Sequence, residues 1–423
     1  MLQPDDARLL DGLDEVAQAR HGVPPTWLAA RRERAAQRLR EVLDRTGVRA
    51  AVRTSPLGPA WSGDLDVHGE LPPEQALRAA GMVPLAPLHR RLSGRAYRTW
   101  AVVEDDTVLG TVDLLGGVPP RPVDAVLARA RRRGEVRLRE VLELRALAAA
   151  GERLPDDPVV RAAAVVEAAH GGAVLAGHDT GEGAHPARHA PAPLPRGRLA
   201  PVRRAAARRR RPLVVALSGV DGAGKSTLAR HLVDDLTAAG IDAAVVWTRP
   251  GMGLGGAAAV ARAAKRLLRH GSAPSVRSVA AGEPPPAARR GLPGLAWALL
   301  VCASFGLQAR RPRLSGRQVL VYDRHLPDAL VTLDVFYPGV PTTLPHRLVR
   351  LALPRADLAC YLDLPADVLR ERKPDDLMGA QTVDAQLAAY ARRLPALPAV
   401  RVVDARQPPQ ALSGRLVREL LTD

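Results

Sequence analysis

The spacing of apolar residues changes along the chain and divides it into two parts with different predicted folds. In the first part, residues 5–46 place apolar side chains at helical intervals, which predicts two helices. Four short runs of β-branched and apolar residues then predict strands, at 48–52, 64–68, 97–103 and 108–115. Further helical spacing predicts helices at 73–80, 122–133, 137–150 and 156–170. We therefore expect a smaller α+β domain over residues 1–176.

The stretch from residue 177 to residue 211 shows neither helical spacing nor apolar strand runs, and it predicts a linker. Glycine, proline, histidine and alanine dominate it, and no acidic residue occurs between Glu182 and Asp221. Such a composition supplies no apolar face to bury, and its prolines stiffen the chain. The sequence therefore predicts two domains, 1–176 and 212–423, joined by a basic linker.

Residues 212–423 alternate apolar strands with helices. Strands are predicted in a run that begins at Leu213 and at 243–247, 318–325, 357–365 and 399–405, and an amphipathic helix at 408–421 closes the chain. This alternation is typical of an α/β fold with a doubly wound parallel sheet. Such sheets bind ligands at the C-terminal ends of their strands, where charged residues follow in this sequence.

The first of these strands leads directly into a glycine loop and a helix start. Gly219, Gly224, Lys225 and Ser226 fill the P-loop pattern G-x-x-x-x-G-K-[ST]. In this motif backbone N–H groups and the lysine hold phosphates, and the serine hydroxyl is a ligand for the Mg²⁺ that accompanies ATP. The residues expected to bind the nucleotide are Gly219, Gly222, Ala223, Gly224, Lys225, Ser226 and Thr227. The alternative is a glycine-rich turn before a core helix.

The charge of the chain does not lead us to expect nucleic acid as its main partner. The 61 Lys and Arg residues against 44 Asp and Glu give a net charge of +17, which by itself favours nucleic-acid binding. However, arginine, alanine, proline and glycine are all abundant while lysine is scarce, as a genome-wide codon bias produces. Only 3% of residues are aromatic, so stacking surfaces for single strands are poorly supplied.

Cysteine usage and the absence of a leader pattern predict a cytoplasmic protein. Cys302 and Cys360 lie far apart in apolar surroundings and have neither metal nor disulfide spacing, which is typical of buried thiols in a reducing compartment. The first ten residues include acids and no basic segment followed by an apolar one, so no signal peptide is expected. The apolar stretch 292–307 is shorter than the ~20 residues that cross a bilayer. It predicts a buried helix, and no membrane partner.

Four stretches after residue 212 together resemble one known family. GVDGAGKST is similar to that family's P-loop, TRPG at 248–251 to its T-R-E-P-G turn, and YDRH at 322–325 to its D-R-Y/F/H signature. YLDLPADVLRERK is similar to the segment that leads into its lid. On these motifs residues 213–423 resemble the thymidylate kinase family of nucleoside monophosphate kinases. The resemblance implies an ATP- and Mg²⁺-dependent phosphotransferase that moves the γ-phosphoryl group to a nucleotide acceptor.

The resemblance also implies roles for single residues. Asp221 would approach the acceptor sugar, and Arg249 the acceptor phosphate or base. Asp323 and Arg324 would sit beside the transferring phosphoryl group. Physical reasoning favours similar assignments, because phosphoryl transfer asks the protein mainly for positioning and positive charge. The alternative for Asp323 and Arg324 is a structural ion pair at a strand end.

The lid is expected to supply a further cation. Some family members carry a catalytic arginine inside the P-loop, at the place where this chain has Gly222. The resemblance then makes Arg370 and Arg372 the candidates, with ordinary helix-surface charges as the alternative. Two other functions stay open, a kinase for another small molecule such as a nucleoside or sugar, and a P-loop ATPase that acts as a switch or regulator. Homodimer formation is also left open.

Three acidic residues of the first domain predict a second site. Asp64 and Asp66 alternate on a predicted strand, so both carboxylates point to one face, and Asp113 lies centrally in another strand. Like charges this close repel unless they bind a divalent metal, as two-metal nucleotidyl transfer requires. Residues 44–117 resemble the minimal nucleotidyltransferase fold in this respect. The stretches that would take the place of its G-S turn are Thr54–Ser55 and Ser62–Gly63. The alternative is a set of solvent-facing acids in an unrelated domain.

Overall fold

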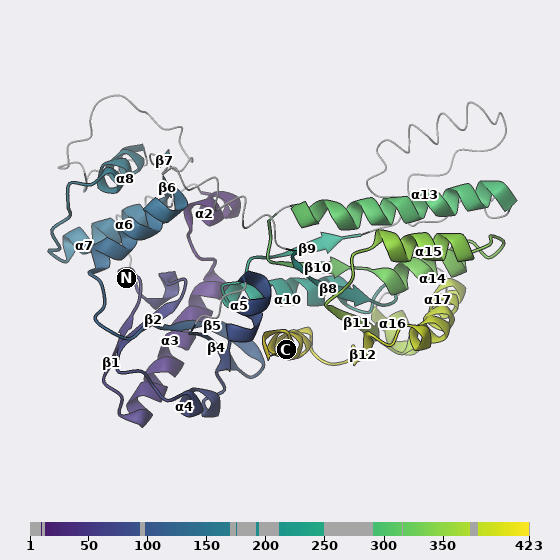
Figure 1. The fold of residues 1–423 in the computed structure, drawn as a ribbon, viewed down its shortest axis with the longest axis horizontal. Coiled ribbons are helices and arrows are strands. Elements are labelled where there is room, and N and C mark those ends of the chain that lie inside the picture. Colours follow the sequence, from purple (N-terminus) through teal and green to yellow (C-terminus); the bar gives the residue numbers. More distant parts are fainter. Residues whose placement is uncertain are drawn as a thin grey trace. The chain divides into compact units, whose positions relative to one another are not determined.

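The computed structural model describes residues 10, 13–93, 98–169, 175, 192–193, 211–248, 291–314, 316–372 and 380–422 (Figure 1). The chain divides into two compact units, and the main boundary falls between Ala207 and Arg208. Two short stretches, Ala238–Gly240 and Leu421–Asp423, group with the N-terminal unit. The main boundary lies inside the predicted linker 177–211, most of which is outside the described residues.

The N-terminal unit contains a five-stranded mixed sheet in the order β1-β2-β5-β4-β3. Its strands are β1 (Ala50–Arg53), β2 (Leu65–Gly69), β3 (Val83–Pro84), β4 (Thr99–Glu104) and β5 (Thr107–Leu114). β2 and β5 are parallel, with Asp66 opposite Asp113, and the other neighbours are antiparallel. Four of these strands were predicted. β3 was missed because two residues are too few to show an alternation.

Helices cover this sheet and form a second layer beside it. They are α2 (Glu15–His21), α3 (Thr26–Thr46), α4 (Glu74–Ala79), α5 (Ala86–Ser93), α6 (Pro122–Arg133), α7 (Leu138–Ala149) and α8 (Pro158–Ala169), with the 3-10 turn η1 (Pro59–Trp61) and the short paired strands β6 (Glu135–Val136) and β7 (Ala192–Pro193). α3 begins directly after Pro25, as predicted, and its Leu39 and Val42 share a buried core with Val67 and Val112 of the sheet. α5 was not predicted.

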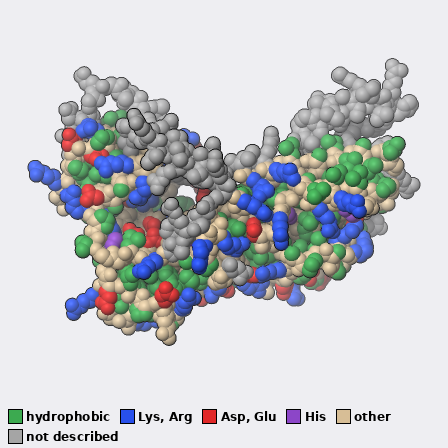
Figure 2. All heavy atoms as spheres, in the orientation of Figure 1, with side chains coloured by type: hydrophobic (Ala, Val, Ile, Leu, Met, Phe, Trp, Pro, Cys, Tyr) green, Lys and Arg blue, Asp and Glu red, His purple; other side chains and the backbone are tan. Residues whose placement is uncertain are grey.

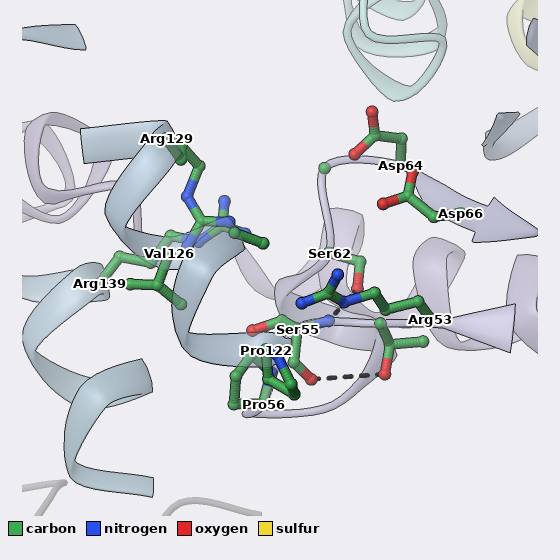
Figure 3. Close-up of a pocket in the computed structure, with 13 residues that line it drawn as sticks. Arg53, Ser55, Pro56, Ser62, Asp64, Asp66, Pro122, Val126, Arg129 and Arg139 are labelled. Carbon is green, nitrogen blue, oxygen red and sulfur yellow. Dashed lines mark hydrogen bonds between the residues drawn. The ribbon is translucent and has the colours of Figure 1, made fainter. Parts of the chain in front are cut away.

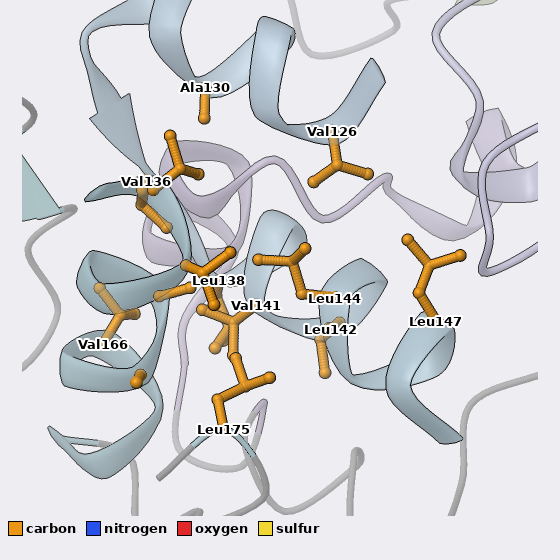
Figure 4. Close-up of a cluster of buried hydrophobic side chains, with 14 of the residues drawn as sticks. Val126, Ala130, Val136, Leu138, Val141, Leu142, Leu144, Leu147, Val166 and Leu175 are labelled. Atoms are coloured by element: carbon orange, nitrogen blue, oxygen red, sulfur yellow. The ribbon is translucent and has the colours of Figure 1, made fainter. Parts of the chain in front are cut away.

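A separate apolar core joins α6, α7 and α8 (Figure 4). Leu138, Val141 and Leu144 of α7 have no exposed surface, and they belong to one cluster with Val126 of α6 and Val166 of α8. The three helices agree with the predicted ranges to within two residues at each end. Because α6 and α7 are fixed by this core, the arginines that they carry have defined positions.

The C-terminal unit is built on a five-stranded sheet in the order β12-β11-β8-β10-β9, and every neighbouring pair is parallel. Its strands are β8 (Leu213–Ser218), β9 (Ala243–Trp247), β10 (Val319–Asp323), β11 (Leu358–Asp363) and β12 (Val400–Asp404). All five were predicted. Every residue of the central strand β8 is buried, so both faces of the sheet are covered. The chain therefore combines one mixed and one all-parallel sheet with many helices.

The helices of this unit are α10 (Lys225–Ala238), α13 (Gly291–Arg310), α14 (Leu326–Phe336), α15 (Thr343–Ala352), α16 (Ala366–Arg372), α17 (Ala380–Arg393) and α18 (Pro409–Thr422), with 3-10 turns η3 (Arg311–Leu314) and η4 (Leu394–Ala396). Residues of α13, α14 and α15 share a core with Val214 and Leu320 of the sheet. α14, α15 and α17 were not predicted. α14 is nearly continuous in apolar residues because it is buried, so it shows no helical period.

The apolar segment 292–307 lies within α13, as a helix that is buried on one side only. Val301, Cys302 and Phe305 are buried, whereas Leu292 and Leu307 are exposed. In the part of the chain that the structure describes, we find no helix with the length and apolar character to cross a membrane. Cys360 on β11 is buried as well, and both thiols are free, as predicted.

Figure 2 shows the basic side chains on one face of the described residues. On the visible face of each unit, Lys and Arg side chains are interspersed with apolar and acidic ones (Figure 2). Nucleic-acid-binding domains usually gather such charges into a patch or stripe. The described residues do not form a continuous basic stripe on this face.

Candidate functional site

The glycine loop, residues 219–224, connects the central strand β8 to α10 at the C-terminal edge of the parallel sheet. Gly219 has a φ of 150°, and a Cβ at this position would lie 2.9 Å from the carbonyl oxygen of Leu362. Only glycine fits there, because any side chain would collide with the backbone of β11. The loop is therefore held tightly against the neighbouring strand.

Lys225, the first residue of α10, turns its side chain back into the glycine loop. Its Nζ donates hydrogen bonds to the carbonyl oxygens of Gly219 at 2.7 Å and Val220 at 2.9 Å, and it lies 3.5 Å from the Asp221 carboxylate. Only 5% of the residue is exposed. Burial, and then the nearby Arg324 cation, lower the pKa of the ammonium. Three acceptors and low solvent exposure hold one positive charge at the centre of the loop.

Ser226 and Asp323 come together beside this lysine. Asp323 ends β10, which is the parallel neighbour of β8, and the Ser226 hydroxyl donates a 2.5 Å hydrogen bond to its carboxylate. A hydroxyl and a carboxylate are hard oxygen donors, which Mg²⁺ prefers. The structure thus brings together two of the predicted site residues, and their donor chemistry fits this metal.

Arg324 lies next to Asp323 in an unusual backbone conformation. Its φ is 81°, in the left-handed region that non-glycine residues rarely adopt. Its guanidinium pairs with Asp221. Burial disfavours the cation, but Asp221 and Asp328 outweigh it and hold the pKa of Arg324 above its ordinary value. A strained backbone thus aims a permanent positive charge at the glycine loop.

Thr248, directly after β9, contacts the end of β10. Thr248 donates from its backbone N and from its hydroxyl to the carbonyl oxygen of Asp323, at 3.3 and 3.2 Å. The predicted acceptor-binding residue Arg249 lies outside the described residues. Thr248 therefore ties the end of β9 to the end of β10 beside the site.

One predicted lid arginine reaches the glycine loop. A Cβ built on Gly224 would lie 4.0 Å from Nη1 of Arg372, and Nη2 of Arg372 donates to the carbonyl oxygen of Ala405 at 3.4 Å. Arg370 lies in the same helix, α16, but its side chain is outside the described part. The exposed Arg372 guanidinium is thus within reach of a ligand held by the loop.

Two buried residues of the site were not predicted, Asp328 of α14 and Tyr390 of α17. The Asp328 carboxylate accepts hydrogen bonds from Gly219 N at 3.3 Å, His325 N at 3.0 Å and the Tyr390 hydroxyl at 2.9 Å. The one available signal is an acid in the apolar run LPDALV. Tyr390 has no sequence signal, because its partner Gly219 is 171 residues away.

The second predicted site also forms, within the N-terminal unit. Asp64, Asp66 and Asp113 each place a carboxylate oxygen within 4.8 Å of the others. Asp66 and Asp113 face each other on the parallel strands β2 and β5. The prediction that Asp64 also lies on a strand is wrong, because β2 begins at Leu65 and Asp64 belongs to the bend before it. The bend still turns its carboxylate toward the other two.

These acids influence one another's ionisation. Burial raises the pKa of Asp113 to about 6, and Asp64 and Asp66 add to the shift while the Thr99 hydroxyl opposes it. Burial and the Asp64 charge also raise the pKa of Asp66. Negative charge at this cluster is therefore unfavourable without a cation, and carboxylate oxygens are suitable ligands for Mg²⁺ or Mn²⁺.

A cavity of about 110 Å³ opens beside two of these acids. Figure 3 shows Arg129 and Arg139 reaching into it from α6 and α7, across from Asp64 and Asp66, while Arg53 lies below these acids in the view, near Ser55 and Ser62. Burial, and then the Arg129 cation, lower the pKa of Arg139 to about 9. The residues of both candidate G-S turns line the same cavity, namely Thr54, Ser55, Ser62 and Gly63. Acids on one wall and arginines on the other suit a metal-bound anion.

The serines of this cavity are held by the protein. Ser55 N donates to the Ser62 hydroxyl at 2.7 Å, and the Ser55 hydroxyl donates to Glu143 at 2.6 Å. Glu143 has no exposed side-chain surface and also pairs with Arg129 and Arg139. This network was not predicted, because it joins the segment before β2 to a helix about ninety residues later.

The sequence matches no protein-family model, and no curated protein matches it. Assignment of a function therefore depends on the residues of the two sites.

Proposed function

We propose that the chain is an ATP- and Mg²⁺-dependent phosphotransferase of the thymidylate kinase type, with a nucleotide as phosphoryl acceptor. In this proposal the C-terminal unit has the doubly wound P-loop kinase fold. The observation that carries it is the grouping of a buried Lys225 with the Ser226–Asp323 oxygen pair at the end of the central parallel strand. A nucleoside triphosphate needs this combination of positive charge and hard oxygen ligands.

In this proposal each residue of the site has a separate role in binding ATP, Mg²⁺ or the acceptor. Backbone N–H groups of the glycine loop and Lys225 bind the β- and γ-phosphates, and Ser226 and Asp323 hold Mg²⁺, which neutralises phosphate charge when bound. Arg324 and Arg372 supply positive charge around the oxygens of the transferring group. Asp221 sits on the acceptor side, and its present pairing with Arg324 orients both side chains.

A labelled-phosphate assay tests this proposal. ATP labelled at the γ-phosphate is incubated with the protein and a panel of nucleoside monophosphates, nucleosides and sugars. Label on a monophosphate is expected, and it should disappear in Lys225→Ala but persist in Arg347→Ala, which removes an exposed cation from α15. Label on a nucleoside or sugar would instead favour a small-molecule kinase. Release of free phosphate without any labelled acceptor would favour an ATPase switch.

For the N-terminal unit we propose a second, metal-dependent activity of the nucleotidyltransferase type. It is favoured by the facing walls of the cavity, Asp64 and Asp66 on one side and Arg129 and Arg139 on the other. The acids would hold a divalent metal, and the arginines would hold a polyphosphate. Mn²⁺ titrated into full-length Lys225→Ala protein should bind, and Asp64→Asn with Asp66→Asn should remove that binding. Equal Mn²⁺ binding in both proteins would eliminate this second function.

A further inference from the structure

The carbonyl oxygen of Gly219 lies between two buried side-chain donors. Lys225 Nζ is 2.7 Å from it, and the Tyr390 hydroxyl is 3.2 Å from it. Tyr390 is 3% exposed and belongs to α17. The backbone N–H of the same residue, Gly219, donates to Asp328 of α14. The first residue of the glycine loop is thus contacted by three separate helices.

Tyr390 has one hydroxyl proton and two acceptors for it. Asp328 Oδ1 is closer, at 2.9 Å, and it carries a negative charge, so it is the stronger acceptor. Burial and the Asp328 charge raise the pKa of Tyr390 well above its ordinary value, so its hydroxyl stays protonated. In this structure the Tyr390 hydroxyl therefore donates its hydrogen bond to Asp328, and Lys225 is the donor to the Gly219 carbonyl.

Nucleotide binding changes this arrangement. If the loop binds ATP, as the proposed function requires, the Lys225 ammonium must turn toward the β- and γ-phosphates. The carbonyls of Gly219 and Val220 then both lose the lysine. Gly219 is a buried residue, so leaving its carbonyl without a donor costs free energy unless another donor replaces the lysine. We propose that Tyr390 is that donor. Its hydroxyl turns from Asp328 to Gly219, while Asp328 keeps the backbone N–H groups of Gly219 and His325.

Tyr390 is in this view a positioning residue that acts through Lys225. Asp328 keeps two backbone N–H donors in both states, whereas the Gly219 carbonyl depends on the Tyr390 hydroxyl once Lys225 has turned away. Leaving this carbonyl without a donor costs more than removing one of the three donors of Asp328, so Tyr390 stabilises the nucleotide-bound loop more than the free loop. A tyrosine that only anchored α17 would stabilise both states equally. The two roles therefore differ in what they do to nucleotide affinity, and this inference rests on the proposed function of the glycine loop.

The test compares Tyr390→Phe with the full-length wild type. Titration calorimetry with Mg²⁺ and a non-hydrolysable ATP analogue should show an affinity reduced about three- to tenfold, the effect of one net hydrogen bond. In the transfer assay KM for ATP should rise by a similar factor while kcat stays within about twofold, because ground and transition states share the turned lysine. Tyr361→Phe is the matched control, since its ring packs on Tyr390 with a 4.8 Å centroid separation. It should leave the affinity unchanged.

A double-mutant cycle and a second structure separate the outcomes. In a Lys225→Ala background Tyr390→Phe should cause no further loss of affinity. Equal affinities of wild type and Tyr390→Phe would overturn this inference alone. A wild type that binds no analogue would overturn the proposed function and this inference with it. If Tyr390→Phe does not fold, a crystal structure of the wild type with the analogue decides, and Lys225 still bonded to the Gly219 carbonyl would refute the exchange.

Discussion

Replacing Asp113 with asparagine removes one of three crowded negative charges and should stabilise the metal-free protein at neutral pH. The Asp113 pKa of about 6 lies some 2 units above the ordinary value for aspartate, and each unit corresponds to about 1.4 kcal/mol. The upper limit is therefore about 3 kcal/mol. Because the side chain is only half-buried, solvent reduces the expected gain to about 1–2 kcal/mol. Asparagine keeps the size of the side chain and the oxygen that accepts from Thr99.

The dependence on pH has a defined sign. An acid whose pKa is raised in the folded state binds protons more tightly there, so the native protein is favoured at low pH and loses stability as pH rises from about 4 to about 6. Asp113→Asn should abolish this loss. Its stabilising effect should accordingly be largest at pH 7.5 and should shrink at pH 5.

Thermal unfolding of the full chain in a chelator measures the effect. The transition of the N-terminal unit should rise by about 3–6 °C in Asp113→Asn at pH 7.5. Asp105→Asn, an exposed substitution in the turn between β4 and β5, is the matched control and should change little. Excess Mn²⁺ should stabilise the wild type and not Asp113→Asn. Identical melting temperatures of the two variants at pH 7.5 would refute the argument from crowded charges.

Three further predictions test other parts of the structure. Arg372→Ala or Arg370→Ala, or both, should lower kcat by about 10² with little change in ATP affinity. Unchanged kcat in both variants would show that α16 does not contribute to the site. Gly219→Ala should destabilise the C-terminal unit by about 2–4 kcal/mol in urea unfolding. Gly224→Ala is the control, because its Cβ would meet no atom closer than 4.0 Å, and it should cost about half as much. Equal losses of stability in the two variants would contradict the predicted collision at Gly219. Glu143→Ala removes the carboxylate that the Ser55 hydroxyl, Arg129 and Arg139 share, while Arg129 keeps Glu140. It should destabilise the N-terminal unit by about 2–3 kcal/mol, and a neutral result would show that this ion-pair network is dispensable.

Most of the fold could be predicted because its strands carry strong local patterns. β8 to β12 are short apolar runs separated by helical segments, and a parallel sheet follows from that alternation. The glycine loop could be predicted for the same reason, since Gly219 to Ser226 form one continuous stretch. The place of Asp323 in the site was predicted only from the resemblance of the YDRH stretch, and the structure brings it to the glycine loop because β10 pairs with β8.

The residues that could not be predicted act through contacts between distant segments. Asp328 reaches Gly219 across 109 positions of the chain, and Tyr390 does so across 171. Neither position has a local spacing that distinguishes it from other polar residues on a helix. Asp64 was placed on a strand because it alternates with Asp66, but the strand begins one residue later. Alternation shows which residues share a face and does not show where backbone pairing starts.

Binding of ATP to the glycine loop tests the central proposal most directly. Titration calorimetry with ATP should give one saturable site in the wild type that requires Mg²⁺. Lys225→Ala should weaken that binding at least about tenfold, because it removes a charge-assisted contact to phosphate, and Arg347→Ala should leave it unchanged. An affinity in Lys225→Ala equal to that of the wild type, or no binding of ATP to the wild type at any Mg²⁺ concentration, would contradict the account.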